Sequence, residues 1–324
     1  MNKTQRCCGV SAPDEEGSWG SNVVTLEMKA PAVRRFSLDV ARTSWFQVLI
    51  TGTILFFIVQ CAFLGTDNPN FVPTLLFLGA FIVPTSFVLY VYEREPVRDI
   101  PLPLLAVSFL WGGVVAMVAA GVLEYQTLRA LGPLQLFGVG FIEESTKLFI
   151  PMIVFVFAAR YRSEAHGLVF GVAAGMGFAA LESMGYGFSA LMRSQGDVRD
   201  AESLLLVRGL LSPAGHAAWT GLVCAVLWRE RAKAGHFTLN LPVVGAFAAA
   251  VLLHALWDIF DSLSSPTFID AAGIEILSAV VALVSLRLLF HMVGEAAGKG
   301  GRVLVPNASA AFELPGRSFL DQVE

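Results

Sequence analysis

The segment Glu143-Glu144-x-x-Lys147 places two adjacent carboxylates and an ammonium group inside an otherwise apolar stretch, residues 134–158. Each ionisable group at the centre of a bilayer costs roughly 3 kcal/mol on insertion scales. Helix formation does not require these charges, so we expect them to face a protein interior or a water-filled cavity. A carboxylate in such a place can act as a general base, with Lys147 as its charge-balancing partner.

Further ionisable groups lie deep within later apolar stretches: Glu182, His216, His254 and Asp258. His254 and Asp258 are spaced i,i+4, so they can approach one metal ion together, or the aspartate can orient the imidazole. Glu143 and Lys147 have the same spacing and are expected to pair. Glu144 is turned away by about 100° and is expected to stay free for other work.

The elements that must position these groups are membrane helices. The chain has 324 residues, of which 55% are hydrophobic and only 15% charged, whereas soluble domains average about 25% charged residues. This composition predicts an all-α polytopic membrane protein. Windows of about 20 apolar residues predict about eight transmembrane helices, at 44–64, 71–92, 103–122, 134–158, 167–192, 204–228, 241–263 and 271–292. The fourth to seventh of these carry the polar groups.

The distribution of Lys and Arg predicts the orientation and the domain limits. These residues are concentrated in the N-terminal flank and in every second loop, which favours both termini in the cytoplasm. Residues 1–43 and 294–324 lack apolar periodicity and are predicted to be disordered cytosolic tails around a membrane-embedded domain at 44–293. The first tail contains Cys7-Cys8, which we interpret as an unpaired thiol pair without an assigned role.

With this orientation, the depths of the polar groups agree. At 1.5 Å per residue, Glu143 and His254 lie roughly 13 Å below the outer ends of their spans. Glu182 comes at roughly 15 Å, His216 at roughly 18 Å, and Asp258 is shallower at roughly 8 Å. Because alternate spans run in opposite directions, sequence position does not impose this agreement. We therefore predict one buried polar site formed by spans four to seven.

Two kinds of hydrolytic chemistry fit this set of groups. Zn²⁺ takes imidazole and carboxylate ligands and keeps a position for water in catalytic sites, and a nearby glutamate can then act as the base on that water. The same residues could also work without a metal, with a glutamate–histidine pair activating water directly.

The four polar segments, in this order on consecutive spans, resemble the four motifs of the PrsW family of membrane-embedded proteases: Glu143-Glu144-x-x-Lys147, Phe178-x-x-x-Glu182, Pro213-x-Gly215-His216 and His254-x-x-x-Asp258. The resemblance covers roughly residues 44–293. It also extends to the wider CAAX prenyl protease and bacteriocin-processing superfamily, whose motifs place Arg, His and Asn at some equivalent positions.

The resemblance implies an intramembrane endopeptidase of the bacterial cytoplasmic membrane. It implies a water-activating role for Glu143 and Glu144, with Lys147 as their partner. It assigns the metal or polar centre to the remaining four groups: Glu182, His216, His254 and Asp258. The implied cofactor is Zn²⁺, although a metal-free glutamate mechanism has been argued for relatives. The implied partners are the lipid bilayer and a membrane-anchored protein substrate, such as an anti-sigma factor, and not nucleic acid.

Two rival functions come from other classes. Intramembrane Glu, Asp and His chains also relay protons, so the same cluster could belong to a proton- or ion-coupled transporter. A scaffold that binds single-span partners without catalysis is the third alternative, and the intact ionisable set argues against it. Zinc bound at about one ion per chain, and lost when His216 or His254 is replaced, would favour the hydrolase over both.

Overall fold

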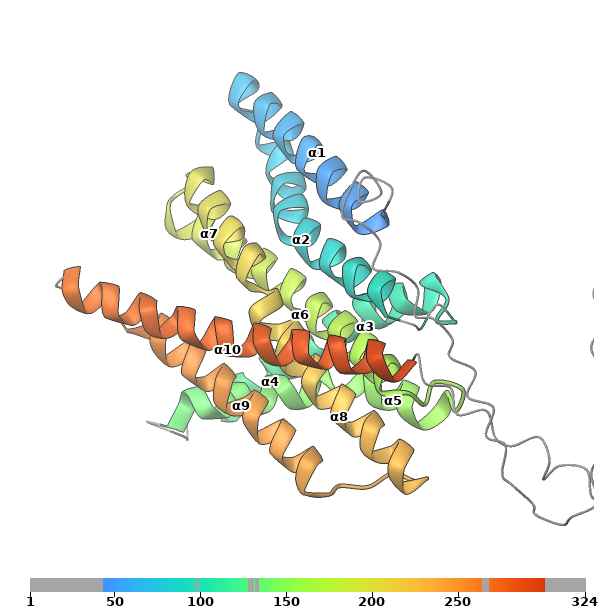
Figure 1. Ribbon diagram of the computed structural model, residues 1–324. Helices are drawn as coiled ribbons and strands as arrows, with labels where there is room; N and C mark the ends of the chain where they lie inside the picture. Colours follow the sequence, from blue (N-terminus) through green and yellow to red (C-terminus); the bar gives the residue numbers. More distant parts are fainter. Residues whose placement is uncertain are drawn as a thin grey trace, which may run out of the picture. The chain divides into compact units, whose positions relative to one another are not determined.

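The computed structural model describes residues 43–95, 97, 99–127, 131, 134–263 and 268–300. The predicted tails outside these ranges, and Cys7-Cys8 with them, lie outside the described residues. The described residues belong to the compact unit Phe36–Glu324. Its elements are α1 (Ser44–Thr66), η2 (Pro69–Phe71), α2 (Val72–Arg94), α3 (Leu102–Thr127), α4 (Gln135–Lys147), α5 (Phe149–Phe157), α6 (Glu164–Arg193), α7 (Val198–Leu211), η5 (Pro213–Ala217), α8 (Ala218–Ala234), α9 (Leu241–Ser262) and α10 (Phe268–Gly300) (Figure 1).

The protein is an all-α polytopic membrane protein, as its composition predicts. The described residues form seven helices long and apolar enough to cross a membrane. The expected fourth span, 134–158, is not one helix but two short ones, α4 and α5, which meet at Leu148. Pro151 explains the break, because a proline has no N–H to donate to the carbonyl of Lys147 four residues earlier. α4 therefore ends at Lys147, inside the protein.

Helix α6 forms the centre of the bundle and packs against α2, α3, α7 and α8. Its glycines permit a close approach to α8, as their spacing predicts. A Cβ atom added at Gly171 would lie 2.7 Å from the carbonyl oxygen of Thr220, closer than real Cβ atoms come. Gly167 and Gly175 lie one turn away on either side and meet α8 and η5 in the same way. The small residues thus bring the polar positions of these helices together.

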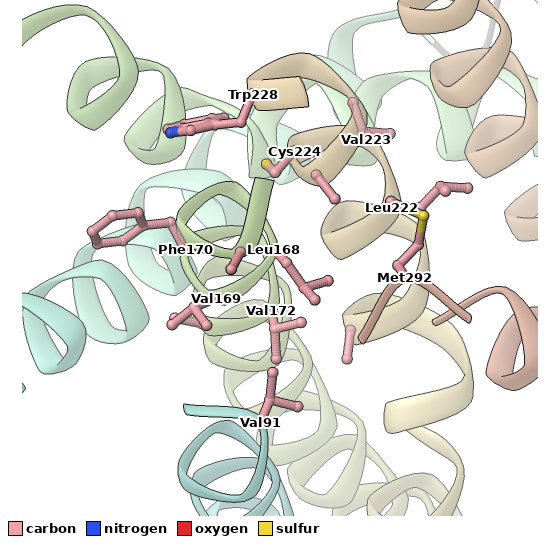
Figure 2. Close-up of a cluster of buried hydrophobic side chains, with 14 of the residues drawn as sticks. Val91, Leu168, Val169, Phe170, Val172, Leu222, Val223, Cys224, Trp228 and Met292 are labelled. Atoms are coloured by element: carbon pink, nitrogen blue, oxygen red, sulfur yellow. The ribbon is translucent and has the colours of Figure 1, made fainter. Parts of the chain in front are cut away.

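The apolar core beside this interface joins α6 and α8 to their neighbours. Leu168 and Val172 of α6 are fully buried together with Cys224 and Trp228 of α8. Figure 2 shows these side chains, with Val91 of α2 and Met292 of α10 at the edges of the same cluster. This core fixes α8 against α6 and thereby holds the polar side chains that follow along both helices.

Helices α7 and α8 form one membrane-length path of 37 residues, with the π-helical turn η5 between them. Pro213 cannot donate to the carbonyl of Gly209, and the Ser212 hydroxyl donates to it instead at 2.9 Å. The N–H of Ala217 reaches back five residues to the carbonyl of Ser212 at 3.5 Å. A turn of this kind absorbs one extra residue. Within it, His216 is directed into the bundle.

Candidate active site and metal centre

The predicted polar residues meet where α4, α6, η5 and α9 come together, and Lys147 lies at their centre. Its side chain is fully buried. Its Nζ donates to Glu143 Oε2 and to Glu144 Oε1, both at 2.9 Å, and lies 2.9 Å from His216 Nδ1. The ammonium group also lies 4.2 Å from the centroid of the Phe178 ring. One cation thus joins two carboxylates and an imidazole from two elements.

The pairing of Glu143 with Lys147 is confirmed, but the expectation that Glu144 stays free is wrong. Residues three apart are also neighbours on a helix, and the long lysine side chain reaches both carboxylates. Glu144 is almost completely buried, and its Oε1 also contacts Nδ1 of His254 at 2.9 Å. Its Oε2 accepts a hydrogen bond from the Thr220 hydroxyl at 3.2 Å. Both oxygens of Glu144 are therefore occupied.

His254 is held through one ring nitrogen and presents the other. Because Nδ1 faces the Glu144 carboxylate, which can only accept, a neutral His254 carries its proton on Nδ1 and its lone pair on Nε2. Nε2 lies 3.4 Å from Glu143 Oε2 and 3.6 Å from Asp258 Oδ2. The imidazole stacks on the Trp219 ring with centroids 4.6 Å apart. The ring is therefore fixed in both position and tautomer.

His216 has the opposite arrangement. Its Nδ1 faces the Lys147 ammonium group, which can only donate, so a neutral His216 carries its proton on Nε2. That nitrogen lies 3.3 Å from Glu182 Oε2. The same oxygen accepts a hydrogen bond from Arg208 Nη2 at 2.8 Å, while Arg208 Nε donates to the Ser183 hydroxyl at 3.2 Å. Glu182 is thus shared between an imidazole and a guanidinium group.

The donor set fits a metal ion such as zinc. One ligand atom each from Glu143, Glu182 and His216 lies within 4.8 Å of the others. Two carboxylates and one imidazole are donors that zinc accepts, and three protein ligands are typical of catalytic zinc. This group shares Glu182 and His216 with the predicted ligands. His254 and Asp258, the other two predicted ligands, lie beside it and 3.6 Å from each other.

A cavity of about 90 Å³ opens beside His216. Its walls include Arg208, Ser183, Trp257 and Asp261, so both hydrogen-bonding and apolar groups line it. Roughly three water molecules occupy such a volume in the liquid. Water can therefore stand next to His216.

Three residues of the site lie outside the set predicted from the sequence. Thr220 follows His216 by one turn, a spacing that could have revealed it. Arg208 lies near the end of its apolar stretch, where a snorkelling side chain is the ordinary expectation. Glu124 of α3 interacts electrostatically with Glu143, Glu182, His254 and Lys147; in the sequence it lies just beyond the expected third span, 103–122, where a charge is ordinary.

The comparison with protein families gives a match over most of the bundle. The sequence model described as PrsW family intramembrane metalloprotease matches residues 100–289, which is more than half of the chain. The matched region extends from the start of α3 into α10 and contains every site residue named above, whereas α1 and α2 lie outside it. No curated protein and no solved structure matches the chain.

Proposed function

The chain belongs to the PrsW family of intramembrane metalloproteases, and on that premise we propose that it hydrolyses a peptide bond in a membrane-anchored protein with water activated by the Glu144–His254 pair. Family membership makes the protein a peptidase and favours this function over the transporter and the scaffold. The observation that carries the mechanism is the 2.9 Å contact between Glu144 Oε1 and His254 Nδ1, which turns His254 Nε2 toward Glu143 and Asp258.

Glu143, Glu182 and His216 would hold the metal ion; His216 would bind it through Nε2, with its proton moved to Nδ1 and the Lys147 ammonium group moved off that nitrogen. When bound, the ion supplies a Lewis acid that polarises the scissile carbonyl and acidifies water. Lys147 balances the negative charge of Glu143 and Glu144, since its Nζ lies 2.9 Å from an oxygen of each. In a site without bulk water, such a fixed charge arrangement needs little reorganisation during the reaction.

His254 would move the protons. Its Nε2 takes a proton from water as the water oxygen attacks the carbonyl carbon, and Glu144 stabilises the resulting imidazolium ion. The same nitrogen then gives the proton to the amide nitrogen as the C–N bond breaks, so that a carboxylic acid and an amine form, and the proton of the acid then passes to the amine. This proposal moves the base from the glutamates to the histidine. Both Glu144 oxygens already accept hydrogen bonds, and Glu143 Oε2 accepts one from Lys147.

The substrate and the location are part of the proposal. The family supports a protein substrate within a membrane, and the resemblance described above adds an anti-sigma factor in the bacterial cytoplasmic membrane as the specific candidate. The excess of Lys and Arg in the N-terminal flank and in alternate loops supports both termini in the cytoplasm.

The test uses the full-length protein in liposomes with a panel of fluorogenic single-span peptides, each an apolar helix of about 20 residues with one Gly-Pro step at varied depth. Wild-type protein is expected to cleave members of the panel, and fragment masses locate the cut. Glu144→Gln and His254→Ala should abolish cleavage without loss of folded protein. His166→Ala is the matched control, since this histidine pairs with Asp99 at 3.0 Å, away from the site. Full activity of His254→Ala would refute the mechanism.

A further inference from the structure

One face of helix α3 carries small side chains that pack against α6, and Glu124 lies on the same face. Ala116 and Ala120 are 0% and 3% exposed and pack against Phe178 of α6. Glu124 follows Ala120 by four residues and therefore lies on the same face, one turn further. The next residue, Tyr125, is 71% exposed and points out of the bundle. The carboxylate is thus directed inward.

The surroundings of Glu124 are those of the candidate active site. Phe178, which covers the preceding turn of α3, also contacts the Lys147 ammonium group at 4.2 Å. The charged groups that act electrostatically on Glu124 come from the site itself: Glu143, Glu182, His254 and Lys147. Through its packing on Phe178, α3 therefore brings a further carboxylate close to the charged groups of the site.

This carboxylate differs from the other three glutamates of the site in its hydrogen bonding. Glu124 Oε1 is buried and accepts no hydrogen bond from any residue that the structure describes. The three glutamates Glu143, Glu144 and Glu182 all accept hydrogen bonds from cationic side chains. Asp258 Oδ2 is, like Glu124 Oε1, buried without a hydrogen bond from a described residue. A buried acceptor without a donor is costly, so such groups are rare unless something else binds to them.

A peptide substrate brings the matching donor. The scissile bond must leave its helix before water and His254 can reach its carbonyl carbon, and unwinding frees backbone N–H groups. No water in the bilayer core can take up those donors, so the protein must supply acceptors. A carboxylate is a strong acceptor for an N–H group.

We propose that Glu124 is a substrate-binding residue whose Oε1 accepts a hydrogen bond from a backbone N–H of the unwound substrate segment beside the scissile bond. The inference rests on the proposed peptidase function and adds to it an anchor on α3, facing the metal ligands and His254. It concerns binding of the polypeptide backbone and therefore applies to substrates of different sequence.

The experiment measures peptide binding separately from cleavage. Fluorescent versions of the single-span peptides are titrated against the His254→Ala protein in liposomes, with and without Glu124→Leu. Loss of the acceptor is expected to weaken binding by on the order of tenfold. Glu124→Gln, which keeps an acceptor oxygen, should lose less. Gln126→Leu, at an exposed position two residues further along α3, is the matched control and should bind as before.

A second series identifies the donor. Backbone N–H groups of the peptide are replaced one at a time by N–CH₃. One position near the cleavage site should weaken binding about tenfold when Glu124 is present and less than twofold in Glu124→Leu, which is the coupling expected of two groups in contact. In otherwise wild-type protein, Glu124→Leu should raise KM and leave kcat within about twofold, as loss of uniform binding does.

Equal binding by Glu124→Leu and its parent, or the same N-methyl losses in both, would overturn the inference. Weakened binding with Gln126→Leu as well would assign the effect to the helix and also overturn it. These results differ from a failure of the proposed function, which would appear as binding without cleavage of any peptide by the wild-type protein.

Discussion

Two carboxylate–imidazole pairs face each other across Lys147, and they use opposite ring nitrogens. In the Glu144–His254 pair the carboxylate contacts Nδ1, at 2.9 Å, and Nε2 faces Glu143 Oε2 at 3.4 Å. In the Glu182–His216 pair the lysine contacts Nδ1, also at 2.9 Å, and the carboxylate faces Nε2 at 3.3 Å. The two histidines therefore differ in which ring nitrogen meets the carboxylate, because Lys147 contacts Nδ1 of His216 and not Nδ1 of His254.

The two pairs also differ in exposure. The side chain of Glu144 is 1% exposed and that of His254 is 4% exposed, whereas the side chains of Glu182 and His216 are 16% and 12% exposed. The less exposed pair, Glu144–His254, can hold one orientation for proton transfer. His216 of the more exposed pair borders the cavity beside Arg208, which has room for water. The two pairs have the same residue types, so their hydrogen-bond partners and their exposure indicate more about function than the residue types do.

The largest effect should come from replacing one carboxylate of each pair. Glu144→Gln removes the negative charge that fixes and stabilises the His254 ring, so kcat should fall by on the order of 10³-fold while bound metal is retained. Glu182→Gln should instead reduce the metal content of the purified protein. Turnover of the fluorogenic peptides and elemental analysis check both. Equal metal loss in the two variants would contradict the assignment of metal binding to the Glu182–His216 pair and not to the Glu144–His254 pair.

The next effect concerns the cation between the pairs. Lys147→Met leaves the buried carboxylates of Glu143 and Glu144 without their shared ammonium group and should lower the free energy of unfolding by about 3–5 kcal/mol. Lys233→Met is the control. Lys233 also pairs with a glutamate, Glu230 at 2.7 Å, but its side chain is 64% exposed, so the change should cost less than about 1 kcal/mol. Thermal unfolding in detergent measures both, and similar losses would contradict the role of Lys147.

A carboxylate that lies outside both pairs gives a third, smaller effect. Glu95 follows α2, beyond the membrane-length helix, is 2% exposed, and neither oxygen accepts a hydrogen bond from a described residue. Burial, and then repulsion from Glu164, raises its pKa from 4.5 to about 7. The folded state therefore binds a proton more tightly than the unfolded state, and stability falls as the pH rises from about 4.5 to about 7.

Glu95→Gln removes this loss. Above pH 7 the variant should be more stable than the wild type by up to about 3 kcal/mol, and below about pH 4.5 the two should be equal. Unfolding midpoints measured across this range test the prediction. A difference that does not change with pH would show that Glu95 acts through packing and not through its charge.

The smallest effect should come from replacing Arg208, which supports the Glu182–His216 pair. Arg208 holds Glu182 Oε2 at 2.8 Å without belonging to the proposed metal ligands. Arg208→Gln should weaken metal affinity by about 10–100-fold, the usual effect of removing a group that orients a ligand. Arg208→Lys should restore part of the affinity, because it keeps the charge but not the planar donor geometry. Unchanged metal affinity in Arg208→Gln would show that the arginine does not orient a metal ligand.

Much of the fold could be predicted from the sequence because a membrane imposes a simple rule. Apolar stretches of sufficient length must be helices, and most expected spans correspond to observed ones. The break between α4 and α5 was missed because hydropathy averages over a window and does not register a single missing N–H at Pro151. The polar residues that the structure brings together could be recognised for a related reason, since a charged side chain in an apolar stretch stands out wherever it lies.

The hydrogen-bond partners could not be predicted in the same way. Helical spacing indicates which residues share a face, but a lysine side chain is long enough to reach more than one neighbour, as Lys147 does with Glu144. Which ring nitrogen of His254 or His216 meets which partner depends on the orientation of whole helices. Glu124 was missed because its position near the site depends on the packing of α3 against α6, and a local sequence pattern does not report contacts between helices.

The wide turn η5 has a consequence for how such a site can arise. At about 100° per residue, Arg208 and Thr220 would lie about 120° apart around a regular helix. Absorbing one residue reduces the difference to about 20°, so that both side chains reach the same chamber from one continuous path. A single inserted codon is enough to create such a turn in an existing helix. Deleting one residue from Pro213–Ala217 would rotate α7 and α8 out of phase and separate the two halves of the site.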